Sequence, residues 1–172
     1  QMFYRDNKYF DALAFYELTS NRFPNTDHAA YGQFMVGKYF LRTKEYDQAI
    51  EEFAAFAENY PDSKYARKAK QELYTLYFNQ GNKYKAIDVM LRYANDYKVE
   101  DDICYANFKA GMAYYALGPK EYPNALRHFK SIADAYPNNR FSKQAVSMVK
   151  LIDAKTKSAA RKPPPPARAA TK

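Results

Sequence analysis

Apolar residues along most of the chain recur at i, i+3, i+4 and i+7, which places them on one face of an amphipathic helix. The pattern is interrupted at regular points, each after a large aromatic residue: Phe23-Pro24, Tyr60-Pro61, Tyr97-Lys98 and Tyr136-Pro137. Proline ends a helix because it has no N–H to donate and disfavours a helical residue before it. The pattern therefore predicts pairs of helices over residues 27–42 and 46–60, 63–80 and 83–97, and 101–117 and 121–136.

Short polar residues and glycines mark where these helices begin and turn. Thr26, Ser63 and Asp101 lie at predicted helix starts, and each has a side-chain oxygen that can accept an N–H of the first turn. We therefore expect them to be N-caps. Gly81 and Gly118 fall between the two helices of a pair, where a tight turn favours glycine.

The helix pairs repeat at a period of 37 residues. One register consists of Phe3, Phe40, Tyr77 and Tyr114, and a second of Gly37, Tyr74 and Gly111. A third register is an alanine followed four residues later by a large side chain: Ala12 and Tyr16, Ala49 and Phe53, Ala86 and Met90, and Ala125 and Phe129. A fixed period of this length is typical of a solenoid of helical hairpins. The pattern therefore favours a binding scaffold over an enzyme.

The N-terminal end departs from the repeat. Residues 3–9 align with residues 40–46, which form the end of a first helix, so the first repeat lacks most of one helix. Its second helix would then have an apolar flank without cover from this chain. We expect that the chain is a piece of a longer protein, or that another segment supplies the missing helix.

The C-terminal end of the array has a different pattern. Residues 139–157 predict one more first helix, with an apolar face of Val146, Val149 and Ile152. Lys150 and Asp153 stand where a further second helix would dock. This helix is therefore expected to cap the array with a polar outer face.

The positive charge of the chain is concentrated in its last residues. The sequence has 27 Lys and Arg, 19 Asp and Glu, and a net charge of +8. Six basic residues and no acidic one fall in residues 155–172, which leaves 21 basic and 19 acidic residues elsewhere. A near-neutral array argues against a nucleic-acid partner. We therefore divide the chain into a repeat array, 1–157, and a basic, Pro- and Ala-rich disordered tail, 158–172, whose prolines 163–166 favour a polyproline II rod.

The second repeat carries Gly37, Phe40, Ala49, Phe53 and Pro61 at positions 8, 11, 20, 24 and 32 of the unit. With this spacing the chain resembles the tetratricopeptide repeat, from Phe3 to about Lys157. The resemblance implies an all-α fold, a right-handed superhelical solenoid of antiparallel helix pairs with about four repeats and a capping helix. It also implies packing roles for Gly37, Phe40, Ala49, Phe53, Tyr77, Ala86, Gly111, Tyr114, Ala125 and Phe129.

Some features depart from the usual tetratricopeptide unit. The period is 37 residues and not 34, so the connectors between helix pairs should be longer. Tyr74 replaces a small residue, and Lys98 replaces the helix-ending proline of the third repeat. The loop inside the fourth pair has two extra residues around 119–122.

The segments Ala49-Ile50-Glu51-Glu52-Phe53 and Tyr60-Pro61-Asp62-Ser63 are similar to those of the bacterial cell-envelope branch of this family. That branch includes the BamD-like outer-membrane assembly lipoproteins and the repeat domain of the Tol-Pal-associated protein YbgF. The resemblance implies a periplasmic, outer-membrane-associated scaffold without catalysis or cofactors, whose partners are other envelope proteins. Any targeting segment would precede Gln1.

The sequence offers few candidates for catalysis or metal binding. Its five glycines form no phosphate-binding loop, and His28 and His128 belong to different repeats, so no shared metal site is expected. We expect His128 to be a partly exposed helix residue and Cys104, which has no histidine nearby in sequence, to be a packed thiol. Adjacent acids such as Glu51-Glu52 point to different helix faces. We therefore predict no enzyme activity, metal or cofactor.

By analogy with tetratricopeptide arrays, the first helices line a concave groove that holds a peptide. The residues placed there by their offsets are Gln33, Lys38, Arg42, Lys70, Tyr74, Asn107 and Lys109. The set is mildly basic and favours a peptide with acidic groups or a C-terminal carboxylate. Each residue alone is also what a solvated helix position would carry.

Two functions therefore remain open. The first is a non-enzymatic scaffold of the bacterial envelope that holds partner proteins in the groove, including a role in outer-membrane protein assembly. The second is an anchoring module, in which the basic residues of 155–172 bind an anionic polymer such as cell wall, or a membrane surface, while the array is displayed. The tail is also consistent with a plain solvated linker.

Overall fold

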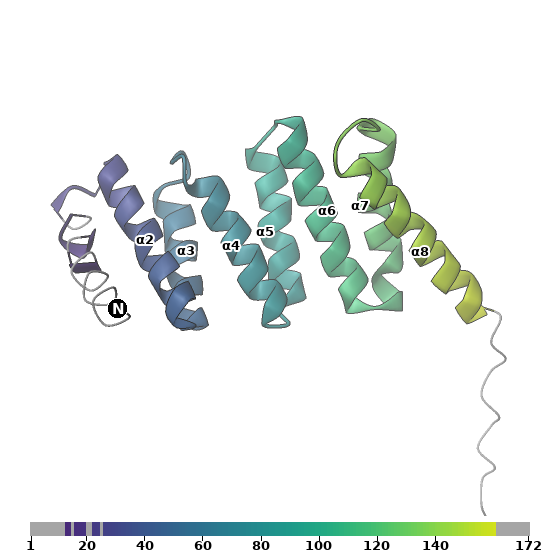
Figure 1. Cartoon of the computed structure of the whole chain (residues 1–172), viewed down its shortest axis with the longest axis horizontal. Helices are drawn as coiled ribbons and strands as arrows, with labels where there is room; N and C mark the ends of the chain where they lie inside the picture. The colour runs from purple at the N-terminus through teal and green to yellow at the C-terminus, as the bar shows by residue number, and fades with distance from the viewer. Residues whose placement is uncertain (1–12, 15, 20–21, 25, 161–172) are drawn as a thin grey trace, which may run out of the picture. The chain divides into compact units, whose positions relative to one another are not determined.

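The structure is a computed structural model that describes residues 13–14, 16–19, 22–24 and 26–160. Its helices are α2 (Asp27–Thr43), α3 (Tyr46–Asn59), α4 (Ala66–Asn79), α5 (Lys83–Asp96), α6 (Glu100–Leu117), the 3-10 helix η1 (Pro119–Glu121), α7 (Tyr122–Ala135) and α8 (Ser142–Ala160) (Figure 1). No strand occurs within the described ranges, and the predicted all-α class is confirmed. The predicted first helix of repeat one and residues 161–172 of the predicted tail lie outside the described residues.

The helices form two compact units, Gln1–Tyr97 and Lys98–Lys172. In the first unit α2 packs on α3, α3 on α4 and α4 on α5. In the second unit α6 packs on α7 and α7 on α8. Short connectors between neighbours make consecutive helices antiparallel, which is the tetratricopeptide-like arrangement of helix pairs that the repeat predicts (Figure 1).

The core of the first unit is largely aromatic. Phe53 and Phe56 of α3 are completely buried, and the ring of Phe34 in α2 lies 5.7 and 5.8 Å from their ring centroids. Gly37 of α2 allows the two helices to approach, because a β-carbon there would lie 2.8 Å from Cε1 of Phe53. The first pair is therefore packed through a small residue on one helix and a ring on the other.

The second unit repeats this contact. A β-carbon on Gly111 of α6 would lie 2.8 Å from Cε1 of Phe129 in α7, and Phe129 is completely buried. In the third repeat, whose helices are α4 and α5, the glycine is replaced by Tyr74 and the phenylalanine by Met90, and both are buried. The bulky ring has thus moved from the second helix of the pair to the first, and the flexible methionine takes the opposite position.

The connectors of repeats two and four contain the same turn. The side-chain oxygen of Ser63 accepts a hydrogen bond from the N–H of Tyr65 at 3.3 Å, and Oδ1 of Asn139 accepts one from the N–H of Phe141 at 3.1 Å. The helices α4 and α8 begin only after this turn, which lengthens the connector as the period predicts. The prediction that Ser63 is an N-cap is therefore wrong, because its side chain closes the turn before the helix.

The other two predicted caps have opposite outcomes. Oγ1 of Thr26 accepts a hydrogen bond from the N–H of Ala29 at 3.2 Å, so its N-cap role is confirmed. The prediction for Asp101 is wrong, because α6 is preceded by Val99, and Asp101 lies inside the first turn. The helix begins at Glu100 and has 18 residues.

The turns inside the helix pairs share a backbone feature. Gly81 has a φ of +85° and Gly118 a φ of +103°, in the region that most side chains avoid, as their predicted turn role requires. Lys44 stands one period before Gly81 and has a φ of +66°. The extra residues predicted in the fourth loop form the 3-10 helix η1.

The last helix, α8, begins and ends later than the predicted range of 139–157. Ile152 is completely buried against α7 and its neighbours, Val149 is half-buried and Val146 is exposed. Lys150 and Asp153 are exposed, as expected of a helix with a polar outer face. Among the described residues, no helix combines the length and the apolar composition that a membrane crossing requires.

Candidate partner-binding surfaces

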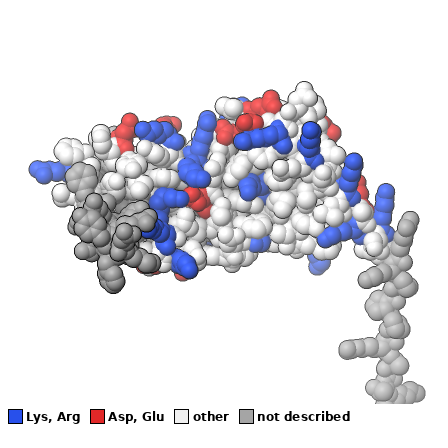
Figure 2. Space-filling view, viewed as in Figure 1, with Lys and Arg blue, Asp and Glu red and all other residues white. Residues whose placement is uncertain are grey.

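The surface formed by α2 and α4, which we call the first-helix surface, carries exposed positive charge. Nζ of Lys38 lies 3.0 Å from Oε1 of Glu72, and Nζ of Lys68 lies 3.6 Å from the same oxygen. The Glu72 side chain is 14% exposed, against 37% for Lys38 and 57% for Lys68. The carboxylate of Glu72 is thus paired with two ammonium groups, both of which belong to side chains more exposed than its own. In the shared view of Figures 1 and 2, α2 and α4 lie towards the viewer, and Lys and Arg side chains are spread over this side.

The near-neutral charge of the array conceals a separation of charge within the first unit. The helices α2 and α4 contain two acidic residues, Asp27 and Glu72, and five basic ones, Lys38, Arg42, Arg67, Lys68 and Lys70. The helix α3 contains no basic residue and four acidic ones, Asp47, Glu51, Glu52 and Glu58. The cluster of acids within residues 46–59 is a sequence signal for this separation, but a charge summed over the whole array hides it. The basic residues of α2 and α4 favour an acidic ligand, and the acidic residues of α3 favour a basic one.

The predicted groove residues of α2 do not all lie on the first-helix surface. Arg42 is exposed in the last turn of the helix, and Lys38 makes the bridge to α4 described above. Gln33 instead accepts a hydrogen bond from Nδ2 of Asn59 in α3 at 3.4 Å, so it faces the second helix of its own pair.

The two predicted groove residues of α4 lie elsewhere. Tyr74 is 4% exposed and stacks on Phe78, with ring centroids 5.6 Å apart, so its prediction as a groove residue is wrong. It stands in the register of Gly37, on the side where the helices of a pair meet. Lys70 turns towards α5, where its Nζ lies 2.5 Å from Oδ2 of Asp96 and its side chain is 11% exposed.

In the second unit Asn107 is engaged with α7. Its Oδ1 lies 2.8 Å from Nδ1 of His128, whose ring stacks on Tyr114 at 5.5 Å. His128 is 7% exposed, and the expectation of a partly exposed histidine is therefore wrong. Burial, with a smaller effect from the charge of Arg127, lowers the pKa of His128 to about 4, so the imidazole is neutral at physiological pH.

The remaining candidates of the second unit are also partly or fully enclosed. Lys109 is half-buried, its ammonium lies 5.6 Å from the ring centroid of Tyr105, and burial lowers its pKa. Cys104 is completely buried; burial, then the charges of Glu100 and Asp101, raises the pKa of its thiol to about 11. This is a packed thiol. Within the described part of the chain, no group of three or more His, Cys, Asp or Glu residues is placed to hold a metal ion.

The residues predicted to pack the helix pairs lie in or beside the two cores. Ala49, Phe53, Ala86, Ala125 and Phe129 are completely buried. Gly37 and Gly111 are buried beside the two phenylalanine rings. Phe40, Tyr77 and Tyr114 are partly buried and pack against the core clusters.

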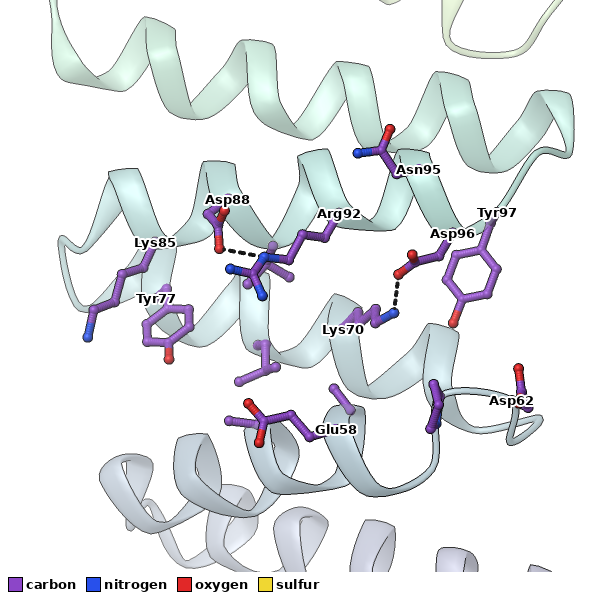
Figure 3. A pocket seen from close by; sticks show the side chains of 15 residues that line it. Glu58, Asp62, Lys70, Tyr77, Lys85, Asp88, Arg92, Asn95, Asp96 and Tyr97 are labelled. Carbon is purple, nitrogen blue, oxygen red and sulfur yellow. Dashed lines mark hydrogen bonds and ion pairs between the residues drawn. The ribbon is translucent and has the colours of Figure 1, made fainter.

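A groove of about 770 Å³ opens on the opposite, second-helix side of the first unit (Figure 3). The helices α3 and α5 form its walls and α4 its floor, and Asp62 and Tyr97 lie towards one end. We call it the α3–α5 groove. Of the predicted groove residues, Lys70 lines it; the others do not.

Two ion pairs lie inside the α3–α5 groove. Asp96 is paired with Lys70, as described above, and Oδ2 of Asp88 lies 3.0 Å from Nε of Arg92 (Figure 3). The ammonium of Lys70 is also 5.2 Å from the ring centroid of Tyr97, the aromatic residue that ends the third repeat. The sequence pattern marks Tyr97 only as a point of interruption, and its part in this wall follows from the packing of three helices.

The comparison with protein families gives one match, to the family described as YfiO, outer membrane lipoprotein, over residues 26–161. The matched range runs from α2 to the end of α8 and includes parts of both units. No curated protein matches the chain. The match confirms the predicted resemblance to the BamD-like branch of tetratricopeptide proteins. Because it spans most of the chain, and the same residues fold into tetratricopeptide-like helix pairs, the chain belongs to the YfiO family of outer membrane lipoproteins.

Proposed function

We propose that the chain is a non-enzymatic, periplasmic scaffold of the bacterial envelope that binds partner proteins of outer-membrane assembly. Membership of the YfiO family supports the outer-membrane context. The stacked helix pairs support protein binding, because each pair adds to an extended surface. The observation that carries the proposal is the separation of charge in the first unit, where cationic α2 and α4 flank acidic α3.

The first-helix surface is suited to an acidic partner segment. Lys38 and Arg42 belong to the groove predicted from the sequence, and Lys68 adds a third cation on the neighbouring helix. Glu72 restrains the two lysines without covering them, so less side-chain freedom is lost when a carboxylate binds. The burial of Cys104 and His128 supports a role without catalysis, since neither side chain is presented to a substrate.

The proposal is tested by site-specific photocrosslinking in the native envelope. A photoreactive amino acid is placed at position 42 or 68, on the first-helix surface, and as a control at position 130, an exposed site on α7. Positions 42 and 68 should capture identified outer-membrane assembly proteins, and position 130 should not. Lys38→Glu combined with Lys68→Glu should abolish capture at position 42. Equal capture at all positions, or capture of no envelope protein at 42 and 68, would contradict the proposal.

The basic tail favours a second candidate function, the anchoring of the array to an anionic polymer or membrane. Lys155 is already engaged, because its Nζ lies 2.6 Å from Oη of Tyr115, so the arm would consist of the basic residues beyond it. Tail-driven binding should fall steeply with salt, whereas binding through the first-helix surface should survive replacement of the basic tail residues by serine. Co-sedimentation with anionic vesicles and with cell-wall material separates the two.

A further inference from the structure

The helix α3 carries a row of carboxylates on one face. Residues 45–62 contain no basic residue and six acidic ones, Glu45, Asp47, Glu51, Glu52, Glu58 and Asp62. Asp47, Glu51, Ala54 and Glu58 stand at i, i+4, i+7 and i+11, which places them within about 60° of one another around the helix and along roughly 16 Å of its length. The three acids are exposed and Ala54 is half-buried. We call these four residues the acidic ridge.

The charge of the acidic ridge is not neutralised by the helices beside it. Its two glutamates form no ion pair with any residue that the structure describes. Two of the three cations that line the α3–α5 groove, Lys70 and Arg92, are held by the ion pairs inside the groove. The third, Lys85, has its ammonium 5.4 Å from the ring centroid of Tyr77 (Figure 3). The carboxylates of the ridge therefore remain available to a cation from outside the chain.

The acids of α3 also repel one another. Burial raises the pKa of Glu52, a hydrogen bond with Gln33 lowers it, and the negative charges of Glu17 and Glu51 raise it further. Like charges at this separation disfavour one another's ionised form. A cation bound beside Glu51 would relieve this repulsion, so the ridge attracts a basic ligand more strongly than one isolated carboxylate would.

The spacing of the acidic ridge fits a second helix. Residues at i, i+4, i+7 and i+11 form the face that one helix presents to another. Ala54, in the middle of the ridge, is small and lies on the wall of the α3–α5 groove, so it leaves room for a close approach. At one end Oδ1 of Asp47 accepts a hydrogen bond from Nε2 of Gln80 at 2.9 Å, which orients the carboxylate and leaves its second oxygen for a ligand.

We propose that the acidic ridge binds a helical segment of a partner protein. The basic residues of this segment are spaced by four and seven residues, so that they meet the three carboxylates, and a small or apolar residue between them packs on Ala54. The inference rests on the scaffold function only in that the partner is a protein. It concerns another helix than the first-helix surface and a partner of opposite charge, so either proposal can fail without the other.

The spacing is tested with two fluorescent, alanine-rich helical peptides of about 18 residues, each with three arginines. In the first peptide the arginines are spaced by four and seven residues and share one face of the helix. In the second they are spaced by five and five residues and point to different sides. Fluorescence anisotropy with the full chain at low salt should show that the first peptide binds at least about fivefold more tightly. Equal affinities for the two peptides would overturn the proposal.

A matched pair of variants separates the acidic ridge from general electrostatics. Glu51→Lys with Glu58→Lys should weaken binding of the first peptide by about tenfold or more, because two attractive carboxylates become repulsive cations. Asp134→Lys with Asp153→Lys changes the net charge by the same amount at exposed positions of the second unit, and should weaken binding by less than about threefold. Circular dichroism checks that both variants are folded. Equal weakening by the two folded variants would mean that the ridge is not the binding site.

The partner itself is identified by photocrosslinking in the native envelope. A photoreactive amino acid is placed at position 48, an exposed site beside the acidic ridge whose replacement leaves the acids intact. Mass spectrometry should map the crosslink to a helical segment with basic residues at the stated spacing, and Glu51→Lys with Glu58→Lys should abolish the crosslink. No capture at position 48, capture of a segment without basic residues, or unchanged capture by the variant would overturn the proposal, whatever positions 42 and 68 capture.

Discussion

Gly37 of α2 and Phe53 of α3 lie so close that a β-carbon on the glycine would be 2.8 Å from Cε1 of the ring. The ring is completely buried, so it has no space into which it could move freely. Gly111 and Phe129 form the same contact in the second unit. The small and large residues that recur in the sequence are therefore explained by one contact, which forms where the two helices of a pair meet.

Gly37→Leu should lower the free energy of unfolding by about 2–3 kcal/mol, because the new side chain overpacks the space occupied by Phe53. Urea denaturation followed by circular dichroism measures the change. Phe53→Leu in the same chain should recover part of the loss, since it opens space beside position 37. Thr75→Leu, at an exposed position of α4, is the control. A loss no greater than in this control would mean that residues 37 and 53 do not pack as described.

Much of the fold could be predicted because helix pairs are local structures. The positions of Pro61 and Pro137 follow from backbone chemistry alone, and the observed helices end just before the tyrosines that precede them. The starts of helices were harder to predict. Ser63 has the chemistry of an N-cap but closes a turn, and the two roles use the same side-chain oxygen. Only the path of the connector distinguishes them.

The binding surfaces could be predicted less well, because an offset within a repeat gives a helix face only when its neighbours are known. Their offsets predict that Lys70 and Asn107 line a groove formed by the first helices, but each interacts with the second helix of its pair. The α3–α5 groove is lined by residues of three helices and two connectors, so no single segment of the sequence predicts it. The sequence shows that residues 46–59 contain acids and no basic residue. Which surface these acids occupy is known only once the faces of the helices are assigned.

The buried imidazole of His128 should make stability depend on pH. Its pKa is lowered to about 4 in the folded chain, against about 6.5 when unfolded, so the unfolded state binds the proton first as the pH falls. The contribution to stability is fully present above pH 6.5 or so and is lost towards pH 4, by about 3 kcal/mol. Denaturation midpoints measured between these pH values test this.

A matched pair of variants isolates the effect of His128. His128→Phe keeps a ring beside Tyr114 but removes the titrating group, so its stability should fall less steeply with acid than that of the natural chain. Thr75→Leu, at an exposed position without a titrating group, should keep the natural profile. Parallel profiles for all three proteins would show that His128 is not held neutral.

The thiol of Cys104 should be nearly inert in the folded chain. Its pKa of about 11 leaves a thiolate fraction about 100-fold below that of a free cysteine near pH 8, and burial blocks access as well. An aromatic disulfide reagent should therefore label the native protein more than about 100-fold more slowly than the urea-unfolded protein. Rapid labelling without denaturant would mean that the first turns of α6 open readily.

Asn139 should be one of the most sensitive polar positions of the second unit. It is 8% exposed, its Nδ2 donates to Oε1 of Glu100 at 3.0 Å and to Oδ1 of Asp101 at 2.8 Å, and its Oδ1 accepts from Phe141. Asn139→Ala should lower the free energy of unfolding by about 2–3 kcal/mol, because two bonds to charged groups are lost at a largely buried site.

The neighbouring Asn138 provides the control for this prediction. It is exposed, and Asn138→Ala should change the free energy of unfolding by less than about 0.5 kcal/mol. Asn139→Asp is a sharper variant, because it keeps the acceptor for Phe141 but places a third carboxylate beside Glu100 and Asp101. It should be at least as destabilising as Asn139→Ala near neutral pH, because the third carboxylate is repelled by the other two. If Asn139→Asp were as stable as the natural chain at neutral pH, Asn139 would not join the start of α6 to the connector before α8.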